Sequence, residues 1–272
     1  MNNKLIISTI CFVALALGCS ETKENSSDAL MSAANGDHRS ASNISRNSSR
    51  HSVETLQFFE IDSSMTVMEI WPGSGGWYTE ILAPYLKEQG RFYAANFTGN
   101  TGVDYYSKAA EKFKKKLAGQ PEIYGKVQLV DLMPPADTTP VADNSIDLIL
   151  SFRNLHNWVN NDIAADMFQI FFKALKPGGT LGLVAHRANP ETLGLESAKT
   201  GYVAESEAIK LAVAAGFTLQ KKSEINANPK DTKDYADGVW TLPPNYKKGE
   251  TDKAKYETIG ESDRMTLKFS KP

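Results

Sequence analysis

Five polar or aromatic side chains that can contact a ligand crowd one short segment, SFRNLHNWVNND. The segment follows an apolar run, residues 144–150, which predicts a buried strand, so it would lie at the strand ends where open α/β sheets bind ligands. The five are Arg153, Asn154, His156, Asn157 and Trp158. An unperturbed imidazole titrates near neutral pH, so His156 suits proton transfer. A structural interpretation competes, in which His156 and Asn157 cap the next helix and Trp158 packs beneath it.

Two further groups of residues reach the same region. His186 and Arg187 follow a strand predicted over residues 180–185, so they would lie at the same edge of the sheet as candidates for substrate binding or proton transfer. A long polar connection, residues 226–263, carries Trp240. Connections of this length are usually functional or disordered, which makes Trp240 a candidate contact for a ligand.

A glycine-dense turn, WPGSGG, would position these side chains. It follows an apolar run, residues 66–70, and precedes residues that recur at helical spacing up to Leu86, so the stretch predicts strand, tight loop and helix. Such a loop lets the backbone approach a ligand, and the amide groups of the following helix point outward. The stretch therefore predicts a nucleotide-like ligand, with a purely structural turn as the alternative.

The residues present exclude two common nucleotide loops. A phosphate-cradling loop requires Lys-Ser or Lys-Thr after the glycines, and the dinucleotide pattern GxGxxG requires a third glycine where Tyr78 stands. The remaining pattern, an acidic residue followed by GxGxG, resembles the first motif of class I S-adenosylmethionine-dependent methyltransferases. Glu69 is the acid of that pattern. Gly73 and Gly75 fill its second and third glycine positions, and Trp71 occupies the first.

The resemblance implies S-adenosylmethionine as the cofactor and assigns further contacts to it. The family places an acidic residue at the end of the second strand, where it binds both ribose hydroxyls. Here that position is Asn96, a neutral amide that accepts with one oxygen. At the end of the third strand, Asp131 would accept a hydrogen bond from the adenine amine, and the backbone amide of Leu132 would meet the ring.

The same resemblance implies roles in the segment after the fourth strand. His156 would be the general base that takes a proton from a substrate hydroxyl, as in small-molecule O-methyltransferases. Asn154 would instead orient an amine, as polar residues at this position do in N-methyltransferases. The predicted contacts of the methyl acceptor, an unidentified small molecule, are Arg153, Trp158, His186, Arg187 and Trp240.

Longer segments resemble a group of predicted bacterial methyltransferases with export signals, among them FRNLHNW, NPKDTKDYADGVWTLPP and the terminal SDRxxLKF. The resemblance covers roughly residues 52–272. It implies an α/β, Rossmann-like class I methyltransferase fold: a mostly parallel seven-stranded sheet with an antiparallel last strand and helices on both faces. A catalytically inactive, membrane-tethered ligand-binding protein that retains this fold is the alternative, because fold does not fix function and S-adenosylmethionine is made in the cytoplasm.

The amino terminus predicts export. Residues 1–19 resemble a lipoprotein-type signal peptide, with an apolar run too short to span a bilayer comfortably and the sequence LGC at its end. This predicts a lipid anchor through Cys19 on the periplasmic side of a bacterial membrane, with the outer membrane as a further guess. A cut after Ala16 would instead release a secreted protein. Residues 20–50, rich in Ser and Asn, predict a disordered tether, and residues 51–272 a methyltransferase-like domain.

Composition describes a soluble globular body and excludes one class of partner. The chain has 272 residues, 41% of them hydrophobic and 23% charged, with a formal net charge of -2. This near-neutral balance gives no electrostatic footprint for nucleic acid, so no nucleic-acid partner is predicted. Both cysteines, Cys11 and Cys19, lie in the leader, so no disulfide is expected in the domain, and no metal site is predicted.

Overall fold

The structure, a computed structural model, describes residues 18–97, 103–136, 138 and 140–272, with only the backbone for residues 18–25. The predicted signal peptide, residues 1–19, therefore lies outside the described residues up to residue 17. Among the helices that the structure describes, none combines the length and the apolar character needed to cross a membrane.

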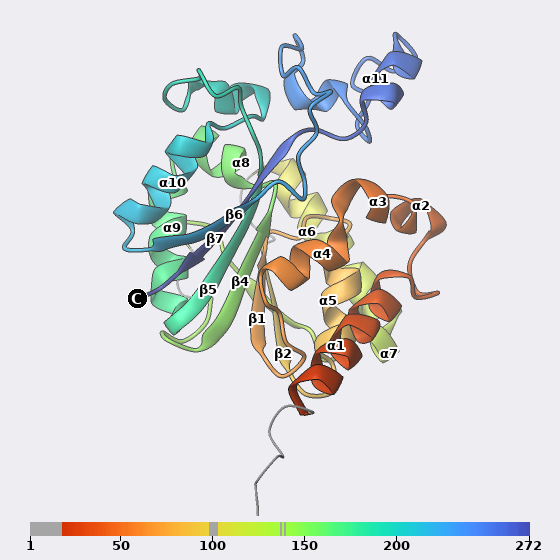
Figure 1. Cartoon of the computed structure of the whole chain (residues 1–272), viewed down its shortest axis with the longest axis vertical. Coiled ribbons are helices and arrows are strands. Elements are labelled where there is room, and N and C mark those ends of the chain that lie inside the picture. Colours follow the sequence, from red (N-terminus) through yellow and green to blue (C-terminus); the bar gives the residue numbers. More distant parts are fainter. Residues whose placement is uncertain (1–17, 98–102, 137, 139) are drawn as a thin grey trace, which may run out of the picture.

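Seven strands form one sheet in the order β3-β2-β1-β4-β5-β7-β6 (Figure 1). Strands β1 to β5 are parallel to one another, whereas β7 is antiparallel to both of its neighbours, β5 and β6. This confirms the predicted class I methyltransferase sheet with its antiparallel last strand. The strands are β1 (Thr66–Ile70), β2 (Arg91–Asn96), β3 (Gln128–Asp131), β4 (Ile146–Phe152), β5 (Leu175–His186), β6 (Thr218–Ser223) and β7 (Arg264–Ser270).

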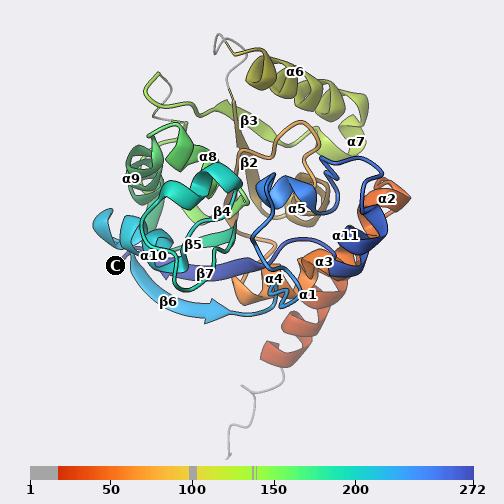
Figure 2. The same cartoon turned by 90° about the horizontal axis from the view of Figure 1, so that it is seen from above.

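The central strands are buried on both faces because successive side chains point to opposite sides of the sheet. Val67 and Leu148 pack in one core, while their neighbours Met68 and Ile149 pack in the other. The first core is covered by α1 (Gly18–Ala34), α4 (Ser52–Phe58), α5 (Thr79–Leu86) and α7 (Pro121–Tyr124). The second core is covered by α8 (Leu155–Asn160), α9 (Ala164–Ala174) and α10 (Glu205–Ala214), and α6 (Asp104–Gly119) lies at the β3 edge of the sheet (Figure 2).

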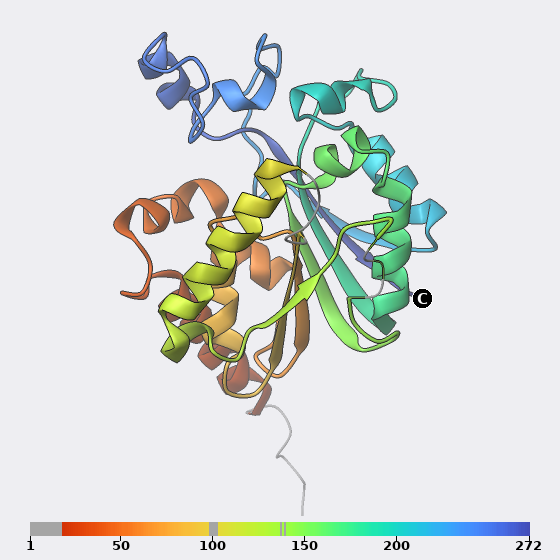
Figure 3. The same ribbon diagram turned by 180° about the vertical axis from the view of Figure 1, so that it is seen from behind.

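The remaining elements gather at the carboxyl ends of the parallel strands. Figure 1 shows the connection between β6 and β7 rising above these ends, with η2 (Gly238–Thr241) and α11 (Lys253–Ile259) in it. The segment after β5, which contains η1 (Glu196–Thr200), lies beside it in the view from behind (Figure 3). The long connection that the sequence marks as functional or disordered is thus an ordered cover of the edge where ligands bind in this class of sheet.

The predicted disordered tether is wrong for residues 26–50. This segment contains the end of α1 together with α2 (Ala41–Ile44) and α3 (Asn47–Arg50), and it packs on the domain. Leu30 is only 1% exposed, and it lies with Ala33 and Ala34 on one stripe of α1 at helical spacing. The ion pair between Arg39 Nε and Glu80 of α5, at 3.1 Å, fastens the segment further.

Candidate functional site

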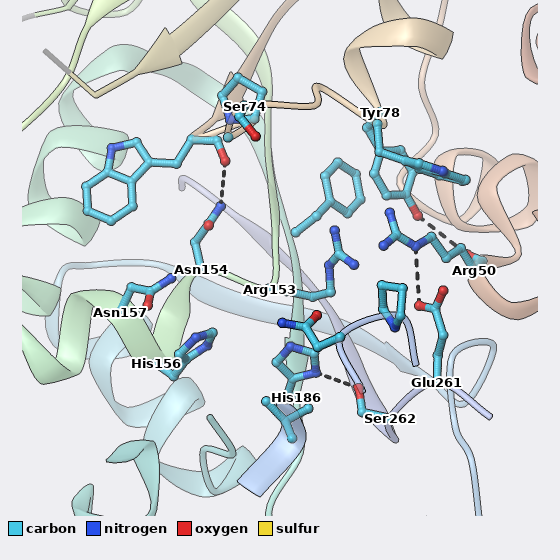
Figure 4. Close-up of a pocket in the computed structure, with 18 of the residues that line it drawn as sticks. Arg50, Ser74, Tyr78, Arg153, Asn154, His156, Asn157, His186, Glu261 and Ser262 are labelled. Atoms are coloured by element: carbon cyan, nitrogen blue, oxygen red, sulfur yellow. Dashed lines mark hydrogen bonds and ion pairs between the residues drawn. The ribbon is translucent and has the colours of Figure 1, made fainter. Parts of the chain in front are cut away.

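A cavity of about 420 Å³ opens at the carboxyl ends of β1, β4 and β5 (Figure 4). Four parts of the chain contribute most of its walls: the glycine-dense turn, the segment after β4, the end of β5 and the connection between β6 and β7; Arg50 and Tyr105 complete them. This volume is in the range of small-molecule sites. Representative lining residues are Gly73, Tyr78, Arg153, His156, His186 and Trp240.

The ends of β1 and β4 are fixed to each other below this cavity. Asn154 donates from its side-chain amide to the carbonyl oxygen of Ile70 at 2.8 Å and, at 3.3 Å, to that of Trp71. Trp71 and Arg153 each follow the last residue of their strand, and both have a positive φ, 48° and 65°. Because a bulky residue rarely adopts this conformation, the two turns are strongly determined by their surroundings. The amide hydrogens of Asn154 are engaged in this support, so Oδ1 is the atom of its side chain available to an incoming N–H or O–H.

Two imidazoles face each other in the cavity wall. The rings of His156 and His186 lie 5.6 Å apart, and His186 Nδ1 shares a hydrogen bond of 2.5 Å with Ser262 Oγ. Burial, and next the charge of Arg153, lower the pKa of His156 to about 4. Burial also holds the pKa of His186 well below its ordinary value. The expectation of an unperturbed imidazole is therefore wrong: both rings are neutral at pH 7, and each is a weaker base than a free imidazole.

The glycine turn approaches the cavity with little side chain on it. Gly73 has a φ of 69°, and a Cβ built on it would meet no atom within 4 Å; the same open space surrounds Gly75. Glu69, at the end of β1, is buried and accepts a hydrogen bond of 2.6 Å from Thr79 Oγ1. Burial raises the pKa of Glu69 to about 7. Gly76, which is not among the predicted contacts, has a φ of 56°, and a Cβ built on it would lie 2.5 Å from the ring of Phe113.

Two predicted substrate contacts do not line the cavity. Trp158 is fully buried in the core, where its ring meets Phe168 and Phe171 edge-on, as the structural interpretation of the segment expected. Arg187 turns away and pairs with Glu224 at 2.7 Å and Asp263 at 3.0 Å. The structure thus corrects both predictions, because packing holds the indole and ion pairs hold the guanidinium. Arg153, His156, His186 and Trp240 do come together.

Three residues outside the predicted contacts also line the cavity: Arg50, Glu261 and Ser262. Arg50 stands in the segment expected to be a tether, and the other two directly precede β7. The apolar stripe of α1 was the available signal that the tether is folded. Nothing in the spacing of Glu261 or Ser262 pointed to the cavity.

Comparison with known proteins decides the fold. A SAM-dependent methyltransferase from Aquifex aeolicus is 14% identical over 84% of this chain and 93% of that chain, with a TM-score of 0.55. A SAM-dependent methyltransferase from Methanosarcina mazei is also 14% identical, over 79% of this chain and 96% of that chain, with a TM-score of 0.51. The chain has the class I methyltransferase fold. The [4+2]-cyclase SpnF is also similar, at 14% identity over 93% of this chain and 96% of its own, with a TM-score of 0.54.

The sequence comparisons agree with this fold. Residues 73–183 match the model of a family described as methyltransferase domain, which covers the glycine turn through most of β5. No curated protein matches the sequence. The family model and the methyltransferase fold indicate S-adenosylmethionine as the cofactor.

The residues that the methyltransferase resemblance assigns to this cofactor are divided between two cavities. Glu69 and Gly73 line the cavity described above, whereas Asn96 and Asp131 line a second cavity beside α6. Neither cavity is lined by Gly75 or Leu132. The two cavities share no lining residue.

Trp71 stands between these two groups. Its indole Nε1 donates to the carbonyl oxygen of Leu132 at 2.8 Å, and its ring lies 4.8 Å from that of Phe97, the residue after Asn96. The side-chain oxygen and nitrogen of Asn96 are buried and have no partner within the described part of the chain. The bare glycine turn and this unpaired amide fit a cofactor with an amino-acid end and a ribose. The indole occupies the strand ends where its nucleoside would lie, so the fit requires this ring to turn aside.

Proposed function

We propose that the protein transfers a methyl group from S-adenosylmethionine to an oxygen or nitrogen atom of a small molecule. The observation that carries the proposal is the neutral imidazole of His156, which faces a cavity lined by the glycine turn. The cofactor, when bound, supplies a methyl group already activated on a sulfonium. What the chain must add is then mainly alignment of the acceptor and removal of its proton.

Residues of the chain can be assigned to cofactor binding, to proton removal and to orientation of the acceptor. Glu69, Gly73 and Gly75 would hold the amino-acid end of the cofactor, and Asn96, Asp131 and Leu132 would hold its nucleoside. His156 accepts the proton of the acceptor at its free ring nitrogen. Asn154 Oδ1 orients an acceptor N–H or O–H, because the amide hydrogens of Asn154 are engaged with β1. Trp240 belongs to the β6–β7 connection, and its ring centroid lies 5.9 Å from that of His156. In this position its indole shields the cavity from water.

Isothermal titration of the full chain with S-adenosylmethionine and S-adenosylhomocysteine tests this proposal, with ATP as a control nucleotide. We expect binding of both sulfur compounds at micromolar concentrations and no comparable binding of ATP. A folded protein that binds neither compound would overturn the assignment. Retention of cofactor binding with full turnover in His156→Ala, measured with the first acceptor found, would remove the base from the mechanism.

A second candidate function is a tethered ligand-binding protein that keeps the fold without the reaction. The position of Trp71 across the expected nucleoside site favours it, since the described cavity beside the glycine turn then holds a smaller ligand. The similarity to a protein named as a cyclase agrees with the general rule that this fold serves more than one chemistry. The titration above separates the two functions, because only the first requires binding of the sulfur compounds.

We also propose that the chain is exported and anchored through a lipid on Cys19. The apolar leader and the LGC sequence support this proposal. Membrane fractionation of cells that produce the wild-type protein or Cys19→Ser is the test. We expect the wild-type protein in the membrane fraction and the variant in the soluble fraction, and equal distributions would contradict the anchor.

A further inference from the structure

Four guanidinium groups surround a single carboxylate at one wall of the cavity. Glu261 pairs with Arg46 Nε at 2.7 Å and with Arg264 Nη1 at 3.0 Å. It also pairs with Arg50 Nε at 3.3 Å. Arg153 is the fourth member, because it lines the same cavity as Arg50 and Glu261, although it makes no ion pair with the carboxylate among the described residues (Figure 4). Four positive charges therefore face one negative charge.

These cations have hydrogen-bond donors to spare. Buried nitrogens of Arg46 (Nη2), Arg50 (Nη1) and Arg264 (Nε) lack a partner among the residues that the structure describes. The guanidinium of Arg153 forms no hydrogen bond or ion pair with any described residue, and only its backbone N–H is bonded, to Val184. A buried donor left without an acceptor is destabilising, and more so when it is charged. The cluster thus has buried N–H donors for which the described part of the chain provides no acceptor.

Two of the four arginines are directed into the cavity. Arg50 is 3% exposed, and its guanidinium lies over the ring of Trp77 at 4.4 Å, which fixes its direction. Arg153 projects from the turn after β4. Figure 4 shows the side chains of Arg50 and Arg153 converging on the same space, with His156 and His186 farther along the wall.

The other titratable groups of the cavity leave this positive charge in place. Glu69 also lines it, but burial raises its pKa to about 7, so it is only partly ionised at neutral pH. His156 and His186 are neutral there. The hydroxyl of Tyr78 is uncharged as well, because burial raises its pKa further. Within the described part of the chain, an anion that entered would meet the unpaired guanidinium of Arg153, the unpaired Nη1 of Arg50 and little opposing charge beyond Glu261.

We propose that Arg50 and Arg153 bind the carboxylate or phosphate group of a small anionic methyl acceptor. The identity of the ligand as an acceptor rests on the function proposed above, whereas the anion site rests on the arginine cluster alone. Guanidinium groups match both kinds of oxyanion through paired N–H donors. With its charged end at the arginines, the acceptor extends toward the rings of His156 and Trp240.

The test compares matched ligands in the full chain by isothermal titration without cofactor. The probes are 4-hydroxybenzoate, its uncharged analogue 4-hydroxybenzamide, and phenyl phosphate. We expect at least one of the two anions to bind tenfold or more tightly than the amide. In Arg153→Gln this preference should disappear, in Arg153→Lys it should survive in part, and in the charge-matched control Arg91→Gln, at the amino end of β2, it should persist.

A stability measurement separates binding from a structural role. Without ligand, the melting temperature of Arg153→Gln should equal or exceed that of the wild type, because the substitution removes an unpaired cation. A clear fall would assign Arg153 to the fold and overturn the proposal. Equal binding of both anions and the amide, or an unchanged preference in Arg153→Gln, would overturn it too.

A last arm titrates S-adenosylhomocysteine into the same variants. If Arg153→Gln weakens its binding as strongly as that of the anions, the arginines serve the carboxylate of the cofactor, and the assignment to the acceptor is wrong. If the wild type binds the anions through Arg153 but does not bind S-adenosylhomocysteine, the anion site stands and the methyltransferase function fails. The two proposals therefore fail separately.

Discussion

The indole of Trp71 donates a hydrogen bond to the carbonyl oxygen of Leu132 at 2.8 Å. Since β2 lies between β1 and β3, this bond crosses the end of β2. Asn96 stands there, and both polar atoms of its side chain are buried without a partner among the described residues. A residue at the first glycine position of the loop thus covers the place where the ribose is expected.

Replacing Trp71 with glycine should open that place. We expect Trp71→Gly to bind S-adenosylhomocysteine at least tenfold more tightly by titration calorimetry, and glycine also suits the φ of 48°. Loss of the buried indole should lower the free energy of unfolding by about 3–5 kcal/mol. Trp71→Phe, which keeps a ring there, serves as the control and should gain little. Weaker binding in a folded glycine variant would show that the indole is part of the ligand site.

The depressed pKa of His156 makes a signed prediction for stability against pH. The folded state keeps the ring neutral down to about pH 4, whereas the unfolded chain protonates it near 6.5. The unfolded state therefore binds more protons between these values, and stability falls as pH falls through this window. Between pH 6.5 and 4, urea unfolding should show a loss of stability that is up to about 3 kcal/mol larger in the wild type than in His156→Gln. Parallel curves for the two proteins would refute the shift.

The raised pKa of Glu69 acts at the other end of the scale. The unfolded chain ionises this carboxyl near pH 4.5, while the folded state holds its proton up to about pH 7. Stability from this group is thus complete at low pH and declines as pH rises from 4.5 to 7. Glu69→Gln, which can still accept from Thr79, should be more stable than the wild type at pH 8 and similar to it at pH 4. The difference in unfolding free energy at the two pH values is the measurement.

Glu80 connects the amino-terminal segment to the domain. Its carboxylate pairs with the buried Arg39 and with Lys116, and it accepts from Asn43 at 3.0 Å. Glu80→Gln would leave Arg39 buried without its counter-ion, at a cost of about 3–5 kcal/mol. Limited proteolysis should spare residues 26–50 in the wild type and cleave them in the variant, with the exposed Glu88→Gln as the control. Rapid cleavage of the wild type within this segment would contradict the packed arrangement.

The sequence predicted the sheet well because its strands are short apolar runs that end in glycine or polar residues. The glycine turn and the run KPGG after α9 fix where strands and helices change, so the positions of Glu69, Gly73 and His156 followed directly. These features are local, and local patterns are what a sequence displays.

What the sequence did not predict depends on contacts between distant segments. The cluster at Glu261 joins Arg46 and Arg50 to Arg264, more than 200 residues away, and no spacing marks such a meeting. The sequence predicts Arg187 as a ligand contact, but in the structure its guanidinium is ion-paired with Glu224 and Asp263. The prediction of a tether rests on composition. The apolar stripe of Leu30, Ala33 and Ala34 is too short to indicate a packed helix among so many Ser and Asn residues.

The position of β7 in the sheet constrains the order in which the chain can fold during synthesis. Since β7 lies between β5 and β6, the ribosome releases β6 before the strand that must join it to the sheet exists. During that interval β6 has no described neighbour to pair with. Glu261, just upstream of β7, has not yet formed its ion pairs with the arginines. We therefore expect the nascent chain to complete the wall of this cavity last, in the same step that completes the sheet.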